Sequence, residues 1–196
     1  MDLCVKITLI RHTEVSEAYH RCYNGHIDIG LSKTGFKQAK ELAKYFSKHT
    51  FDGVFCSDLK RTKDTLCGFT QEKNAVYTDK LREKSWGKHE GLTFDEIIAQ
   101  NEISYENFIQ WINALDGEPY EQYIQRVREF FLEFLPSLQK ENILVVTHAG
   151  VIRILIYIIN EITLEEAFSI TIPYSSYIVY DTKANSFSDV KLIEPC

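Results

Sequence analysis

Residues 143–152, ILVVTHAGVI, and residues 5–14, VKITLIRHTE, decide how this chain folds. Each stretch begins with a mostly apolar run rich in Ile and Val, which is typical of a strand buried on both faces of a parallel sheet. Each run passes directly into a polar segment that contains one histidine. Ligands bind beyond the carboxyl ends of the strands in such sheets, so we expect the two histidines to meet in one site.

Helical periodicity separates the predicted strands. Residues 32–48 carry apolar side chains at helical spacing behind Ser32, which can cap a helix. A long amphipathic helix is expected after the break at residues 117–119 and extends to Leu138. Further strands are expected at residues 54–56, 75–78, 176–181 and 188–193. Helix-capping residues are expected at three more places: Ser57 with Asp58, Thr93 with Glu96, and Thr163 with Glu166.

The alternation of strands and helices predicts an α/β fold. We expect a three-layer α-β-α arrangement with a mostly parallel central sheet and a helical insertion near residues 93–138. No repeat and no linker rich in Gly, Ser or Pro divides the sequence. The chain is therefore expected to form a single domain over residues 1–196.

Composition and charge narrow the class of protein. The chain has 196 residues, 44% of them hydrophobic, and a net charge of −6, which suits a globular protein better than a general nucleic-acid-binding surface. The longest nearly apolar stretch, residues 151–159, contains Arg153 and is too short to cross a bilayer. The first six residues lack the pattern of a signal peptide. The five cysteines are widely spaced, so we expect reduced thiols and a cytoplasmic location.

Two arginines, two histidines and one carboxylate follow the predicted strands. Arg11 and His12 follow the first strand, Arg61 and Glu83 come shortly after the second and third, and His148 follows the fourth. Guanidinium groups match phosphate oxygens, and a neutral imidazole is a nucleophile that needs no metal. A carboxylic acid can protonate a leaving oxygen. The set predicts phosphoryl transfer, which depends mainly on positioning and charge stabilisation.

Four motifs in the same order along the chain resemble those of the histidine phosphatase superfamily, also called phosphoglycerate mutase-like. The motifs are residues 11–14 (RHTE) with Asn24 and Gly25, residues 57–62 (SDLKRT), residues 81–84 (LREK) with Gly87 and Glu90, and residues 146–153 (VTHAGVIR). The resemblance implies the fold of that family. It also implies a phosphatase that acts on a small phosphomonoester, without a cofactor or a metal.

The resemblance assigns a role to each matching residue. His12 would carry the phosphoryl group, and Arg11, Arg61 and His148 would complete the phosphate pocket. Glu83 would donate a proton and later accept one. The remaining matches would lie beside the substrate: Asn24, the backbone of Gly25, and the backbone N–H of Ala149.

Three positions depart from the pattern of the family. Ala18 stands where Asn is frequent, so one phosphate contact is missing or replaced. Thr13 replaces a frequent Gly, and His89 replaces a frequent Trp. The first motif, taken together with residues 21–25 (RCYNG), is most similar to that of the alpha-ribazole phosphatases within the superfamily.

Two other functions compete with a phosphatase. A cofactor-dependent phosphoglycerate mutase would use the same pocket, but such mutases usually carry a longer insertion and tail than 196 residues allow. A catalytically silent domain that binds a phosphorylated ligand would not need all five chemical groups. Trp111 and Tyr120 belong either to the core or to a lid over the site, and Glu118 with Arg126 is expected to be structural.

Overall fold

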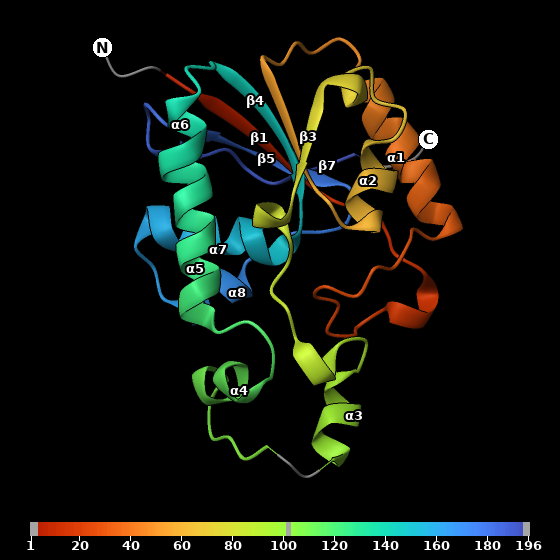
Figure 1. The fold of residues 1–196 in the computed structure, drawn as a ribbon, viewed down its shortest axis with the longest axis vertical. Helices are drawn as coiled ribbons and strands as arrows, with labels where there is room; N and C mark the ends of the chain where they lie inside the picture. The colour runs from red at the N-terminus through yellow and green to blue at the C-terminus, as the bar shows by residue number, and fades with distance from the viewer. Residues whose placement is uncertain (1–3, 101–102, 194–196) are drawn as a thin grey trace.

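A seven-stranded sheet forms the centre of the fold (Figure 1). The computed structural model describes residues 4–100 and 103–193. The strands are β1 (Lys6–Arg11), β2 (Gly53–Ser57), β3 (Ala75–Thr78), β4 (Asn142–Thr147), β5 (Ser176–Asp181), β6 (Ser186–Phe187) and β7 (Lys191–Leu192). Their order is β3-β2-β4-β1-β5-β6, with β7 also paired to β5. Pairs among β1 to β4 are parallel, as predicted, and every pair that involves β5 is antiparallel.

Helices cover both faces of the sheet, which confirms the predicted three layers. In Figure 1, α1 and α2 lie on one side of the strands, α5 to α7 lie on the other, and α3 and α4 lie below the sheet. The helices are α1 (Lys33–Phe46), α2 (Lys60–Leu66), α3 (Phe94–Ala99), α4 (Phe108–Ala114), α5 (Tyr120–Arg128), α6 (Leu135–Ser137), α7 (Ala149–Asn160) and α8 (Leu164–Ser169). Short 3₁₀ turns occur at η1 (Glu17–Tyr19), η2 (Glu72–Asn74), η3 (Asp79–Leu81) and η4 (Gly87–His89).

The buried strands pack against helices on both faces because successive side chains of a strand point in opposite directions. On β4, Leu144 belongs to a cluster with Phe46 of α1, whereas Ile143 belongs to a cluster with Leu155 of α7. Both β4 residues are fully buried. The continuous apolar run that predicts this strand is therefore explained by the two helical layers.

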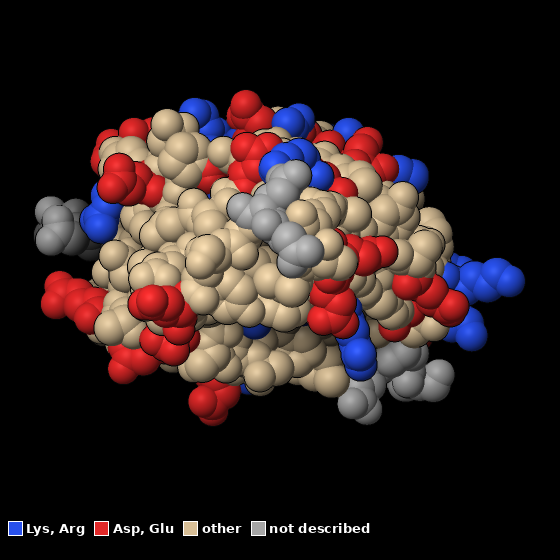
Figure 2. Space-filling model, turned by 90° about the horizontal axis from the view of Figure 1, so that it is seen from below, with Lys and Arg blue, Asp and Glu red and all other residues tan. Residues whose placement is uncertain are grey.

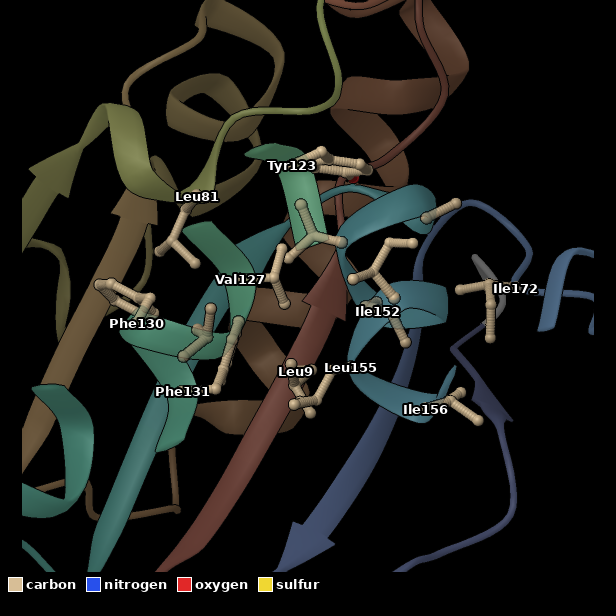
Figure 3. Packing of buried hydrophobic residues seen from close by; sticks show 14 of the residues in the cluster. Leu9, Leu81, Tyr123, Val127, Phe130, Phe131, Ile152, Leu155, Ile156 and Ile172 are labelled. Carbon is tan, nitrogen blue, oxygen red and sulfur yellow. The ribbon is translucent and has the colours of Figure 1, made fainter. Parts of the chain in front are cut away.

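The predicted long helix before β4 is confirmed with one irregularity. The helix α5 continues into a π-helical segment, η5 (Glu129–Phe134), and then into α6. Figure 3 shows Val127 and Phe131 from this helix, and Ile152 and Leu155 from α7, packed above the sheet. No helix in the described part of the chain has both the length and the apolar character needed to cross a membrane.

Three of the predicted helix caps are confirmed. The Ser32 hydroxyl accepts a hydrogen bond from the Gly35 backbone N–H at 2.9 Å. Capping boxes begin α3 and α8, where a threonine and a glutamate three residues later each bind the other's backbone N–H. These contacts fix where the helices begin.

The predicted cap at Ser57 and Asp58 is wrong. The helix α2 begins later, behind Leu59, and has no side-chain cap. The Ser57 hydroxyl instead lies 2.9 Å from Nε2 of His148, and Asp58 forms an ion pair with Arg82 at 2.6 Å. Both residue types cap helices well, but here each has a tertiary partner.

The packing predicts that two Leu→Ala substitutions lower the free energy of unfolding by clearly different amounts. Leu155 is fully buried and Leu192 is 46% exposed. Leu155→Ala should lower the free energy of unfolding by about 2–5 kcal/mol because it leaves a cavity in the core. Leu192→Ala should lower it by less than about 0.5 kcal/mol. Urea denaturation followed by circular dichroism measures both values, and similar losses for the two variants would contradict this account of the core.

Candidate active site

A cavity of about 510 Å³ opens at the carboxyl ends of β1 and β4. The predicted site residues that line it are Arg11, His12, Asn24, Glu83 and Ala149. The predicted residues that lie outside its lining are Gly25, Arg61 and His148. The residues predicted from the sequence therefore form two groups, one that lines the cavity and one that does not.

The register of β1 against β4 brings the two histidines together. Arg11 pairs with Thr147, and the backbone N–H of His12 donates to the Thr147 carbonyl at 2.9 Å. His12 and His148 are the next residues after these two strand ends. Their ring centroids lie 5.2 Å apart at an angle of 63°.

The hydrogen bond of the His12 ring fixes which ring nitrogen carries the proton. Nδ1 of His12 lies 2.9 Å from the backbone carbonyl of Thr13. A carbonyl oxygen only accepts, so Nδ1 carries the ring proton and donates it. In the neutral ring the lone pair then resides on Nε2. His12 is one of the residues that line the cavity.

Both histidine rings are held neutral. Burial lowers the pKa of His12 well below 6.5, and the positive charges of Arg61 and Arg11 lower it further. The pKa of His148 is also well below its usual value, first because of burial and then because of Arg61. Uncharged imidazoles therefore stand between permanent cations at neutral pH.

Arg61 connects His148 to the loop at residues 24–27. Its Nε donates to Nδ1 of His148 at 3.3 Å, so His148 carries its proton on Nε2, which donates to the Ser57 hydroxyl. The two terminal nitrogens of Arg61 donate to the backbone carbonyls of Asn24, Gly25 and Ile27 at 2.7–3.1 Å. Burial lowers the pKa of Arg61 to about 10, so the guanidinium stays charged at neutral pH.

Arg11 binds a different part of the chain from Arg61. Its Nη1 donates to the Ile172 carbonyl at 2.5 Å, and its Cζ lies 3.9 Å from the centre of the Tyr174 ring. Its Nε has no hydrogen-bond partner among the described residues and is buried. A buried cationic N–H without an acceptor can bind an anion that enters the cavity.

Glu83 is positioned by three hydrogen-bond donors. Its Oε1 accepts from the Tyr123 hydroxyl at 2.6 Å and from the Lys84 backbone N–H at 3.1 Å. Its Oε2 accepts from the Gly150 backbone N–H at 2.9 Å. Burial raises the pKa of Tyr123 well above 10, so its hydroxyl keeps the proton that it donates. A side chain at position 150 would overlap the Glu83 carboxyl, which explains the glycine.

The loop at residues 24–27 is held by a carboxylate. The backbone of Gly25 was expected beside the substrate; its N–H donates to Glu90 at 2.8 Å, and Gly25 is not among the residues that line the cavity. The same carboxylate accepts from the backbone of His26 and Ile27. Asn24 does line the cavity, and its Oδ1 is buried without a partner in the part of the chain that the structure describes.

The positions that depart from the family pattern have local explanations. The buried Thr13 donates its backbone N–H to the Thr65 hydroxyl at 3.0 Å. His89 is buried and accepts from the Asp116 backbone N–H at 3.0 Å, away from the cavity lining. The loop that contains Ala18 also brings Arg21 to the cavity. The backbone of Arg21 is left-handed, with φ of 62°. Arg21 is thus a cation at the cavity to which the motif comparison assigned no role.

The sequence analysis assigned no catalytic or binding role to two further residues of the site. Tyr123 binds Glu83, and Tyr174 stacks on Arg11 and lies 5.5 Å from the His12 ring. Their signal in the sequence is weak, because Tyr123 fits the apolar face of a helix and Tyr174 stands in the turn before β5. The Glu118–Arg126 ion pair, at 2.6 Å, has the structural position that was expected.

The described residues contain no group of three or more His, Cys, Asp or Glu side chains that could hold a metal ion.

The family model of the histidine phosphatase superfamily, branch 1, matches residues 7–194 of the sequence. This chain belongs to the histidine phosphatase superfamily. The predicted family and the predicted enzyme class, a phosphatase, are both confirmed.

Similar proteins place the chain among phosphatases of this fold. It is 29% identical over 157 residues to an adenosylcobalamin/alpha-ribazole phosphatase from Escherichia coli, covering 78% of this chain and 77% of that protein. It is 27% identical over 180 residues to phosphoserine phosphatase 1 from Hydrogenobacter thermophilus, covering 89% and 85%. The solved alpha-ribazole phosphatase from Shigella flexneri shares the fold, with a TM-score of 0.79 at 24% identity over 97% of this chain and 96% of that one.

The neutral histidines predict a loss of stability in mild acid. Unfolded His12 and His148 take up protons near pH 6.5, whereas the folded rings do not, so the free energy of unfolding should fall as the pH drops from 7 to 5. Each ring contributes at most about 1.4 kcal/mol per pH unit. His12→Asn should remove the contribution of one ring, and the exposed His49→Asn should serve as the control. Urea denaturation at pH 7, 6 and 5 would contradict this if His12→Asn kept the slope of the wild type.

Proposed function

We propose that this protein hydrolyses small phosphomonoesters through a phosphohistidine formed on Nε2 of His12. The observation that carries the proposal is a neutral His12, with its proton on Nδ1, at the wall of a cavity that also holds the charge of Arg11. Such a ring can attack phosphorus without first losing a proton. The cationic groups around it suit the charge of a phosphoryl group.

The first step transfers the phosphoryl group to the enzyme. Nε2 of His12 attacks phosphorus, and the bond between phosphorus and the ester oxygen breaks. The protonated carboxyl of Glu83 gives its proton to the leaving alcohol. Tyr123 and the Gly150 backbone hold that carboxyl in one orientation throughout.

The second step releases phosphate. A water molecule attacks the phosphorus atom of phosphohistidine, and the bond to Nε2 of His12 breaks. Glu83, now ionised, takes a proton from the water and returns to its starting form. Arg11 and Arg61 supply fixed positive charge in both steps, so the reaction as proposed needs no metal ion.

The substrate is proposed to be a small phosphorylated metabolite of the cytoplasm. Alpha-ribazole 5'-phosphate is one candidate, supported by the relative from Escherichia coli that is named for this activity. A phosphoglycerate mutase would return the phosphoryl group to its substrate instead of releasing it. Measuring free phosphate against isomerisation of phosphoglycerate separates the two reactions.

The nucleophile can be identified directly. Wild-type protein mixed with p-nitrophenyl phosphate and quenched within milliseconds in alkali should carry one phosphoryl group on His12, detected by mass spectrometry. His12→Asn should carry none and should lose at least about 10⁴-fold in kcat, because no other group forms the intermediate. His49→Asn, a substitution outside the cavity, is the matched control. A phosphoryl group on any other residue would contradict the proposal.

Glu83 should matter differently in the two steps. The p-nitrophenolate ion leaves without a proton, so Glu83→Gln should still form phosphohistidine from p-nitrophenyl phosphate. The second step lacks its base in this variant, so phosphohistidine should accumulate to a higher fraction than in the wild type. A Glu83→Gln enzyme that released phosphate at the wild-type rate would exclude the proposed role.

A further inference from the structure

The cavity extends beyond the reacting groups as a space walled by aromatic rings. We name this part the aromatic chamber, and its rings are Tyr23, Trp86, Phe108, Trp111, Tyr120 and Phe168. They come from the loop before α1, from the segment after Glu83, and from α4, α5 and α8. The proposed two-step reaction uses none of them, so their gathering at this site needs another explanation.

The rings of the chamber hold one another in place. Nε1 of Trp111 donates to the Tyr23 hydroxyl at 2.8 Å, and the rings of Tyr23 and Trp86 meet at 5.1 Å in a T-shaped contact. The centre of the Tyr120 ring lies 6.4 Å from that of Trp86 and 6.1 Å from that of Phe168. A wall fixed in this way is already arranged before a ligand arrives, which lowers the entropy cost of binding.

One polar group in the chamber lacks a partner. The side chain of Tyr120 is 6% exposed, and its hydroxyl oxygen makes no hydrogen bond to any residue that the structure describes. Burial raises the pKa of Tyr120 far above 10, so the hydroxyl remains a donor. Buried polar groups without partners are rare in proteins, and Tyr120 is one of the residues that line the cavity.

The size of the cavity suits a ligand larger than a phosphoryl group. A cavity of about 510 Å³ falls in the range that holds a whole organic ligand, so a phosphoryl group occupies only part of it. Figure 2 views the end of the molecule that carries α3 and α4. Uncharged side chains cover much of this end, and both acidic and basic side chains stand around them.

We propose that the alcohol portion of the substrate carries a planar aromatic or heteroaromatic ring, which stacks in the chamber and accepts a hydrogen bond from Tyr120. This inference rests on the proposed function, because the phosphoryl group must be bound at His12. It adds the chemical class of the substrate's alcohol portion, which is argued from the residues of the aromatic chamber. Compact phosphate esters, such as those of short aliphatic alcohols, leave the chamber empty and are therefore poor substrates.

Four synthetic esters with primary alkoxide leaving groups test the inference without a difference in leaving-group chemistry. They are ethyl, 2-cyclohexylethyl, 2-phenylethyl and 2-(pyridin-4-yl)ethyl phosphate. The kcat/KM for 2-phenylethyl phosphate should exceed that for ethyl phosphate at least about tenfold because the ring is buried. It should exceed that for 2-cyclohexylethyl phosphate about threefold or more through contacts between aromatic rings. The pyridine nitrogen should add about another threefold at pH 8.

Two variants assign these preferences to residues. Tyr120→Phe should reduce the ratio of kcat/KM between the pyridyl and phenyl esters to about one. Phe168→Leu should reduce the ratio between the phenyl and cyclohexyl esters. Tyr77→Phe, at an exposed position on β3, should leave both ratios at their wild-type values. Ratios between substrates are compared because any general loss of activity cancels in them.

The outcomes separate this inference from the proposed function. If all four esters were hydrolysed with similar kcat/KM and phosphohistidine formed on His12, the aromatic substrate class would be wrong and the proposed function would stand. A pyridyl preference that survived Tyr120→Phe would overturn the assigned hydrogen bond. If no ester were hydrolysed and no phosphohistidine formed, both proposals would fall.

Discussion

The parallel pairing of β1 with β4 is the constraint on which the whole site depends. Because Arg11 lies opposite Thr147, β1 and β4 end side by side at the same edge of the sheet. The residue that follows each strand is a histidine. A register shift of one residue would turn the side chains of a strand to the other face of the sheet. The two helical layers prevent such a shift, since each strand is packed tightly on both faces. The packing of the core therefore determines how far apart the two imidazoles lie.

Electrostatics explains why this arrangement is reactive and also stable. Buried guanidinium groups are costly unless polar groups surround them, and Arg61 meets that need with three backbone carbonyls and the His148 ring. The histidines respond by staying neutral, which avoids further positive charge in the same small volume. None of the ion pairs among the described residues contains Arg11 or Arg61, although the Glu83 carboxyl lines the same cavity as Arg11. In the proposed reaction, a phosphoryl dianion would bring negative charge to these guanidinium groups.

Much of the fold and part of the site can be predicted from the sequence. The continuous apolar strands and the capping boxes indicate the layers, and motif order identifies the family, because these signals are local. What the sequence does not show is which partner a polar side chain takes across the fold. Ser57 has the type and position of a helix cap but binds His148, and the Gly25 backbone binds Glu90. Tyr123 has the spacing of a core residue, and only tertiary packing places its hydroxyl on Glu83.

The charge and tautomer of His12 test the central claim most directly. Nitrogen-15 NMR of the imidazole side chains, with His12 assigned through the His12→Asn variant, reports the protonation of each ring nitrogen separately. At pH 6, where a free imidazole is mostly protonated, the account predicts a neutral ring with the proton on Nδ1 and a bare Nε2. A doubly protonated His12 at that pH, or a neutral ring with its proton on Nε2, would contradict it.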